Sequence, residues 1–196
     1  MTSQPENVLD LFELTGAYLK GHFRLTSGLH SPEYLQCALV LSHPKHAETQ
    51  GRALAVHLQA LTRERPIGLV VSPAMGGVII GHEVGRALGV PALFTERESG
   101  VMTLRRGFHI DPGTAVVVVE DVVTTGGSTR EVIALLRNIG AEVLAAGSII
   151  DRSGGAVDLG VPRVALHTMK VTAWPPEECP LCELGTPVVK PGSRAV

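Results

Sequence analysis

The sequence lacks the features of a membrane-spanning or secreted protein. No apolar run among its 196 residues approaches the roughly 20 residues needed to cross a bilayer. The first residues, MTSQPENVLDLFEL, contain no basic segment followed by an apolar core, so no secretory signal is visible. The chain has only three cysteines, an odd and low number that gives no disulfide framework. These absences predict a cytoplasmic protein without a membrane partner.

Lysine is scarce, and the net charge is small. Lysine occurs only at positions 20, 45, 170 and 190, against thirteen arginines. The formal net charge of −2 argues against a nucleic-acid-binding surface, so we expect no nucleic-acid partner. The planar guanidinium of arginine matches carboxylate and phosphate oxygens. The preference for arginine is therefore either functional or a consequence of genomic base composition.

Apolar runs alternate with helical patterns along the chain. A first helix is predicted from residue 8 to near the stretch KGHF (20–23), and further helices at residues 47–61, 77–88 and 128–139. The strands are predicted at residues 67–72, 91–96, 114–121, 142–151 and 162–169. The strands are continuous apolar runs, which indicates burial on both faces and a parallel sheet covered by helices. Residues 24–36 and 97–113 are rich in turn-forming or polar residues and are predicted to be irregular. We therefore predict an α/β fold in a single domain, residues 1–196.

The stretch VVVVEDVVTTGGST, residues 116–129, carries the strongest chemical pattern. Glycines and a helix start let main-chain N–H groups converge on one point, which favours phosphate binding. Glu120 and Asp121 directly before this turn would repel a phosphate, so they must face hydroxyls or a cation. A ribose 5-phosphate supplies both the phosphate and the hydroxyls. The alternative is a helix after a buried strand with incidental acids.

This stretch resembles the signature of the phosphoribosyltransferase family: an apolar strand, two acids, two apolar residues, Thr, a small residue, Gly and Ser or Thr. The resemblance implies a type I phosphoribosyltransferase fold, the donor 5-phosphoribosyl 1-pyrophosphate, and Mg²⁺ bound with the pyrophosphate. It identifies no side chain as a metal ligand. The donor-binding residues that it implies at this stretch are Glu120, Asp121, Val122, Val123, Thr124, Thr125, Gly126, Gly127 and Ser128.

Three further stretches resemble the orotate-specific members of that family: FRLTSGLHSPEYL (23–35), DRSGG (151–155) and PPEECPLCELGTPVVKPGSR (175–194). This likeness implies that Arg152 binds the orotate carboxylate, that Thr124 contacts both substrates, and that Thr26 lies near the base. It also implies a homodimer that shares a loop, and a small hood over the base, formed by about residues 1–40 and 170–196. Arg152 could instead pair with Asp151 or Asp158, and Thr124 could only stabilise its loop.

The region that corresponds to the mobile loop of the family departs from the usual pattern. Arg97 matches the first position, but the usual lysines and histidine are absent. Arg105 and Arg106 follow and either supply the missing charge at the pyrophosphate or form a solvated basic turn. Two lysines of the family are also replaced, by Thr26 and Gly76. The expected catalytic residues are therefore Glu120, Asp121 and Arg97.

The implied reaction transfers the phosphoribosyl group to N1 of orotate, which gives orotidine 5′-monophosphate and pyrophosphate in pyrimidine biosynthesis. Two alternatives stay open: a phosphoribosyltransferase for another base, and a non-catalytic regulator that binds the donor. The acids and the loop are common to all three, whereas Arg152 and the N-terminal stretch favour orotate.

The pair Cys179 and Cys182 has the spacing of a zinc knuckle or a redox pair. A structural zinc ion needs four ligands, and the chain has no second cysteine pair. His167 could join the pair only if the fold brings it near. The eight histidines are scattered and suggest no ligand triad, and only His109 is expected near substrate. We therefore predict a turn that packs two small thiols.

Overall fold

The computed structural model describes residues 7–25, 27–63 and 65–191. The chain divides into two compact units: unit 1 combines Met1–Val40 with Lys170–Val196, and unit 2 is Leu41–Met169. No helix within the described ranges is both long enough and apolar enough to span a bilayer.

Unit 2 is built on a six-stranded sheet with the order β5-β4-β3-β6-β7-β8. All neighbouring strands are parallel except the antiparallel pair β4 and β5. The strands are β3 (Leu69–Pro73), β4 (Ala92–Glu98), β5 (Val101–Leu104), β6 (Ala115–Val123), β7 (Glu142–Asp151) and β8 (Arg163–Thr168). The predicted α/β fold with a mainly parallel sheet is confirmed.

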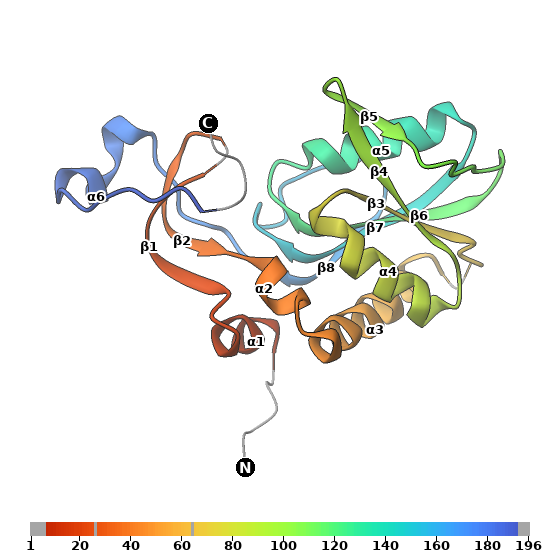
Figure 1. Ribbon diagram of the computed structural model, residues 1–196, viewed down its shortest axis with the longest axis horizontal. Coiled ribbons are helices and arrows are strands. Elements are labelled where there is room, and N and C mark those ends of the chain that lie inside the picture. Colours follow the sequence, from red (N-terminus) through yellow and green to blue (C-terminus); the bar gives the residue numbers. More distant parts are fainter. Residues whose placement is uncertain (1–6, 26, 64, 192–196) are drawn as a thin grey trace, which may run out of the picture. The chain divides into compact units, whose positions relative to one another are not determined.

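Helices cover both faces of this sheet (Figure 1). Helices α3 (Pro44–Leu61) and α4 (Gly76–Leu88) lie on one face, and α5 (Gly127–Asn138) lies on the other. The valines of β6 explain why both faces are needed. Val116, Val117, Val118 and Val119 are all fully buried, and successive strand residues point to opposite faces.

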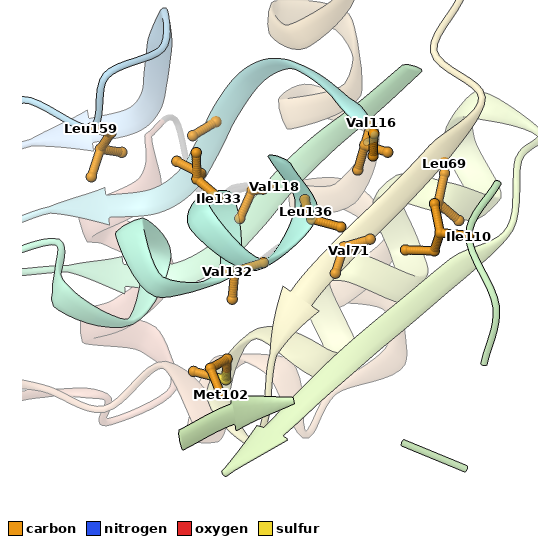
Figure 2. Close-up of a cluster of buried hydrophobic side chains, with 12 residues drawn as sticks. Leu69, Val71, Met102, Ile110, Val116, Val118, Val132, Ile133, Leu136 and Leu159 are labelled. Carbon is orange, nitrogen blue, oxygen red and sulfur yellow. The ribbon is translucent and has the colours of Figure 1, made fainter. Parts of the chain in front are cut away.

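The face under α5 holds a continuous hydrophobic core (Figure 2). Val132, Ile133 and Leu136 of α5 pack there with alternate residues of the central strands. The buried members of this cluster are Leu69, Val71, Met102, Ile110, Val116, Val118, Val132, Ile133, Leu136, Ala141, Ala146 and Leu159. The core thus fixes the start of α5 relative to the end of β6.

On the other face, α4 approaches the sheet unusually closely because three of its contact residues are glycine. A Cβ atom at Gly81 would lie 2.0 Å from the Ser72 hydroxyl oxygen, and one at Gly85 would lie 2.9 Å from the Cβ of Ala92. At Gly77 it would lie 3.0 Å from the Val119 carbonyl oxygen. The first turn of α4 is therefore held directly against β3 and β6.

Unit 1 contains an antiparallel hairpin of β1 (Tyr18–Arg24) and β2 (His30–Leu35). The remaining elements are α1 (Val8–Leu14), α2 (Cys37–Leu41), which runs on by one residue into unit 2, the 3-10 turn η1 (Pro176–Glu178) and α6 (Pro180–Glu183). Helix α1 starts with a capping box, in which Asn7 and Asp10 bind each other's main-chain N–H.

The two segments predicted to be irregular contain strands, so those predictions are wrong. Residues 24–36 include β2, and residues 97–113 include the end of β4 and all of β5. The β4–β5 hairpin turns at Ser99 and Gly100, both with positive φ, as two-residue hairpin turns require. Charged residues on an edge hairpin hide the apolar pattern of a strand, because edge strands tolerate them.

Candidate functional site

The direction in which the chain adds successive strands to the sheet reverses at its centre, between β3 and β6. Strands β3 and β6 are neighbours, but the chain leaves β3 through α4 toward β4 and leaves β6 through α5 toward β7. Such a reversal in a parallel sheet leaves a crevice beyond the carboxyl ends of the two strands, where ligands bind. Residues 73–76 and 124–126 connect β3 to α4 and β6 to α5 at this end of the sheet.

The two predicted acids lie at this end of β6. The strand continues to Val123, two residues beyond its predicted end. A Cβ atom at Gly76 would lie 2.6–2.7 Å from the Asp121 carboxylate, and one at Gly77 would lie 3.2 Å from Oε1 of Glu120. Both carboxylates therefore pack against the first residues of α4, in space that only glycine leaves open. The glycine at position 76, where the family usually has lysine, makes room for Asp121.

The two acids have different electrostatic environments. Burial, followed by the negative charge of Asp121, raises the pKa of Glu120 well above its usual range. The main-chain N–H of Val122 donates to Oδ1 of Asp121 at 2.8 Å. The Glu120 carboxyl therefore holds its proton more strongly than an exposed glutamate does.

This raised pKa predicts a pH-dependent effect of Glu120→Gln on stability. The folded chain holds the Glu120 proton to a higher pH than the unfolded chain does, so the associated stability is complete below the unfolded pKa and is lost as pH rises through the folded pKa. Glutamine stays neutral at every pH. We expect the variant to melt at a higher temperature than the parent at neutral pH, and this difference to vanish in mild acid.

Thermal melts of both proteins across pH test this expectation. Glu177→Gln, which removes an exposed carboxylate, is the matched control and is expected to leave the shape of the pH profile unchanged. A melting difference between Glu120→Gln and the parent that is the same at every pH would contradict the assignment.

The turn after β6 forms the start of α5. Gly126 precedes the helix with φ +73°, in the left-handed region that favours glycine. A Cβ atom there would also lie 2.7 Å from side-chain carbons of Val157 and Leu159. The first main-chain N–H groups of a helix have no partner within the helix, and they carry partial positive charge. This turn can therefore hold an anion such as a phosphate.

Arg130 contacts the turn after β6, and the sequence pattern did not identify it. From the first turn of α5 it donates to the Thr125 carbonyl at 2.7 Å and to the Asp158 carbonyl at 3.0 Å. These bonds link the turn after β6 to the segment after β7. The signal in the sequence was weak, because a single arginine in a helix is most often a surface residue.

The three arginines expected at the pyrophosphate all lie on or near the β4–β5 hairpin, and all pair with glutamates. Arg97 binds Glu131 of α5 at 2.6 Å. Arg106 binds Glu96 with two hydrogen bonds of 2.8 Å. Arg105 lies 3.6 Å from Glu98. All three guanidinium groups are partly exposed to solvent and lie beside carboxylates.

The residues expected at the base lie at two places. Arg152 follows β7, and its main-chain N–H donates to the Val123 carbonyl at 2.8 Å, which fixes it beside the end of β6. The Asp151 carboxylate, one of its alternative partners, is bound by Arg163 and Ser153. Thr26 lies outside the described residues. His109 is exposed and binds Asp111 at 3.0 Å.

A second group of polar side chains lies in unit 1. His22, His30, Cys179 and Cys182 bring one ligand atom each to within 4.8 Å of one another. The sequence predicts no ligand triad of histidines; the structure places two histidines beside the two cysteines, and His167 is not one of them. Contacts between residues distant in sequence, which spacing does not show, bring these side chains together.

Most of the chain is similar in sequence to known phosphoribosyltransferases. The sequence matches the family of the phosphoribosyl transferase domain over residues 40–177. It is 57% identical over 192 residues to an orotate phosphoribosyltransferase of Heliobacterium modesticaldum, covering 96% of this chain and 98% of the relative. It is 51% identical to an orotate phosphoribosyltransferase of Thermotoga maritima, covering 96% and 99%.

The fold is similar to that of solved structures. A crystal structure of orotate phosphoribosyltransferase from Aeropyrum pernix superimposes with a TM-score of 0.69 at 27% identity, covering 82% of this chain and 93% of that chain. A structure of UMP synthase from Leishmania donovani superimposes with a TM-score of 0.66 at 23% identity, covering 82% of this chain and 35% of that chain. At that identity the second likeness concerns the fold alone.

Proposed function

The chain belongs to the phosphoribosyltransferase family, and we propose that it transfers the phosphoribosyl group of 5-phosphoribosyl 1-pyrophosphate to orotate. The products are orotidine 5′-monophosphate and pyrophosphate, and the reaction belongs to pyrimidine biosynthesis. One observation carries the proposal: the acid pair Glu120 and Asp121 lies against the glycines of α4, directly before an anion-binding turn. That arrangement matches the hydroxyls and the phosphate of one sugar.

The donor would bind along the end of β6. The 5-phosphate would accept hydrogen bonds at the turn and the start of α5, and the ribose hydroxyls would donate to the two acids. The residues assigned to this binding are Glu120, Asp121, Val122, Val123, Thr124, Thr125, Gly126, Gly127 and Ser128. The carboxylates accept hydrogen bonds from the ribose hydroxyls, and the phosphate binds at the electropositive start of α5. The negative acids and the negative phosphate therefore do not face each other.

The reaction needs no protein nucleophile. The bond between the sugar and pyrophosphate breaks as positive charge develops on the ribose ring, and Glu120 and Asp121 stabilise that charge. Correct positioning of bound reactants can contribute roughly 7–11 kcal/mol to lowering a barrier. The close packing of both acids against Gly76 and Gly77 of α4 supports this role.

The leaving pyrophosphate requires positive charge, and Arg97, Arg105 and Arg106 are the candidates. Each is paired with a glutamate in the free protein, so engagement of the pyrophosphate requires exchange of a carboxylate for phosphate oxygens. The two-residue turn of the hairpin permits such movement more readily than a central strand would. We assign Arg97 the catalytic role, with Arg105 and Arg106 assisting.

Mg²⁺ is the proposed cofactor. Carboxylates and hydroxyls are the functional groups at the end of β6 and in the following turn, and these hard oxygen donors suit Mg²⁺. Mg²⁺ often binds through the phosphates of a substrate and keeps several waters, so the donor would supply most of its ligands. It would neutralise charge on the pyrophosphate, and we assign no protein side chain as its ligand.

Orotate recognition is assigned to Arg152, Thr124 and Thr26. Arg152 lies beside the end of β6, and its guanidinium suits the carboxylate that distinguishes orotate from purines and uracil. We retain the hood over the base, formed by about residues 1–40 and 170–196, as a proposal. A cytoplasmic homodimer that shares the hairpin region is also proposed, and the exposed Met75, Ile79 and Val101 offer apolar contact area.

The decisive experiment supplies the donor and Mg²⁺ with one base at a time and measures base-dependent pyrophosphate release. Orotate is expected to support turnover, and uracil, adenine, guanine and hypoxanthine are not. Turnover with another base alone would overturn the assignment of orotate. Donor binding without turnover on any base would identify a non-catalytic binding protein.

Arg130→Ala is expected to raise the donor KM about three- to tenfold, because two hydrogen bonds that hold the turn after β6 are lost, at ~1 kcal/mol. The kcat is expected to change little, because the Arg130 side chain binds a main-chain carbonyl of the turn and is not assigned a contact with the reacting atoms. Arg137→Ala is the matched control. It removes a similar bond, from the same helix to the Gly160 carbonyl, and leaves the turn intact. Equal effects of the two variants on the donor KM would contradict this role.

A further inference from the structure

Four potential metal ligands converge in unit 1 from two distant parts of the chain. His22 and His30 belong to the β1–β2 hairpin, whereas Cys179 and Cys182 flank and enter α6. His22, His30 and Cys179 are buried, and Cys182 is exposed. We propose that these four side chains bind one zinc ion that ties the C-terminal segment to the hairpin. None of the four side chains is among the residues assigned to phosphoribosyl transfer.

The hairpin places its two histidines by a local irregularity. The pairing of β1 with β2 shifts between Lys20 and Phe23. His22 and Phe23 are consequently both buried, although neighbouring strand residues usually face opposite sides. Such bulges re-aim a side chain. His30, at the first position of β2, is then close enough for its Nδ1 to lie 2.9 Å from Nε2 of His22.

The C-terminal segment is fixed to the hairpin on both sides of the cysteines. Trp174 and His30 exchange main-chain hydrogen bonds of 2.8 and 2.9 Å. Val189 accepts from the main-chain N–H of Arg24 and donates to the His22 carbonyl, both at 2.8 Å. The intervening chain must pass the histidines, and its turn at Cys179 and Cys182 presents both sulfurs to them.

The distances suit a tetrahedral zinc site. Zn–N bonds of about 2.0–2.1 Å and Zn–S bonds of about 2.3 Å place two nitrogens about 3.3 Å apart and a nitrogen and a sulfur about 3.6 Å apart. The two ring nitrogens are 2.9 Å apart. Sγ of Cys179 lies 3.5 Å from Nε2 of His22. Sγ of Cys182 lies 3.7 Å from the same nitrogen and 3.3 Å from Nδ1 of His30.

A hydrogen bond to the Thr186 carbonyl orients the imidazole of His22 for metal binding. Nδ1 of His22 lies 2.8 Å from the Thr186 carbonyl oxygen, so this nitrogen donates its proton and leaves the Nε2 lone pair for the metal. Zinc-bound histidines almost always donate their other N–H to such a partner. The same contact anchors the chain just after Cys182.

The kinds of ligand atom indicate which metal binds and what its role is. Two sulfurs and two imidazole nitrogens in tetrahedral positions are typical of zinc, and a set of four protein ligands is typical of a structural site. Binding releases the proton of each thiol, and the resulting two thiolates balance the charge of Zn²⁺. Small structural units bury few apolar groups and commonly rely on a metal or disulfides, which fits the small unit 1.

Metal analysis of the untagged, full-length protein tests the proposal. We expect about one zinc per chain after dialysis against metal-free buffer, and near-complete loss of zinc in Cys182→Ser and His30→Ala. Cys37→Ala is the matched control, because Cys37 is a buried cysteine of unit 1 outside the cluster, and it should keep its zinc. Zinc absent from the parent even after reconstitution, or equal zinc in all variants, would overturn the site.

Cobalt substitution provides a readout that does not depend on whether Cys182→Ser and His30→Ala fold. Cobalt in the parent protein is expected to show the intense visible bands of tetrahedral coordination and a thiolate-to-metal charge-transfer band. Cys182→His keeps four ligands, so it should retain the metal and lose about half of the charge-transfer intensity. Octahedral spectra, or unchanged intensity in Cys182→His, would refute coordination by these cysteines.

Discussion

Replacing Asp121 by asparagine is expected to lower kcat by about 10²- to 10³-fold, the range seen when one group aimed at transition-state charge is removed. Asparagine keeps the shape of the side chain over Gly76, where there is no room for a larger group. It removes the negative charge that faces the developing cation. Steady-state kinetics with orotate and the donor measure the loss, and the melting temperature should change little.

Asp158→Asn is the matched control for this substitution. Asp158 accepts the Gly160 N–H at 2.8 Å in the segment after β7, and it is not among the residues assigned to substrate binding. Its kcat should stay close to that of the parent. If Asp121→Asn retained parental kinetics, the acid pair would have no part in the reaction.

Arg152→Ala is expected to raise the KM for orotate by about 30-fold or more, corresponding to the ~2 kcal/mol lost when one partner of a charge-assisted pair is removed. The KM for the donor should change little, because the donor binds along the end of β6. Initial rates measured against each substrate in turn separate the two effects.

Two comparisons make the Arg152 experiment specific. Arg152→Lys keeps the charge and loses the planar fork, so it should recover only part of the affinity for orotate. The competitive inhibition constant of uracil, which lacks the carboxylate, should be insensitive to Arg152→Ala. A loss of affinity for orotate and the donor to the same extent would assign Arg152 to the structure of the site instead of to the carboxylate.

The sheet and its main chemical motif could be predicted because their causes are local. Four consecutive valines before Glu120 indicate a strand buried on both faces, and the structure buries all four. The glycines at 126 and 127 mark the helix start within one residue of its predicted position. The close packing of Gly76 against Asp121 was not visible, because it depends on the order of strands in the sheet.

The features that were missed depend on contacts between distant residues. Residues of the β4–β5 hairpin look like a polar loop because Glu96, Arg97 and Glu98 are charged. Arg97 pairs with Glu131 of α5, and the two glutamates pair with arginines just after β5. Cys179 and His22 are far apart in sequence, and only the attachment of the C-terminal segment to the hairpin brings them together. Such contacts cannot be predicted from the spacing of residues along the chain.

The glycines of α4 also affect how the molecule assembles. The helix contains four of them, at positions 76, 77, 81 and 85. Gly81 and Gly85 lie in the helix interior, where each glycine costs about 1 kcal/mol relative to alanine. This segment is a poor helix in isolation and needs the sheet to hold its conformation. We therefore expect this helix to form late in folding and to exchange its amide hydrogens early when the protein begins to unfold. Catalytic activity should then be lost before the rest of the domain unfolds.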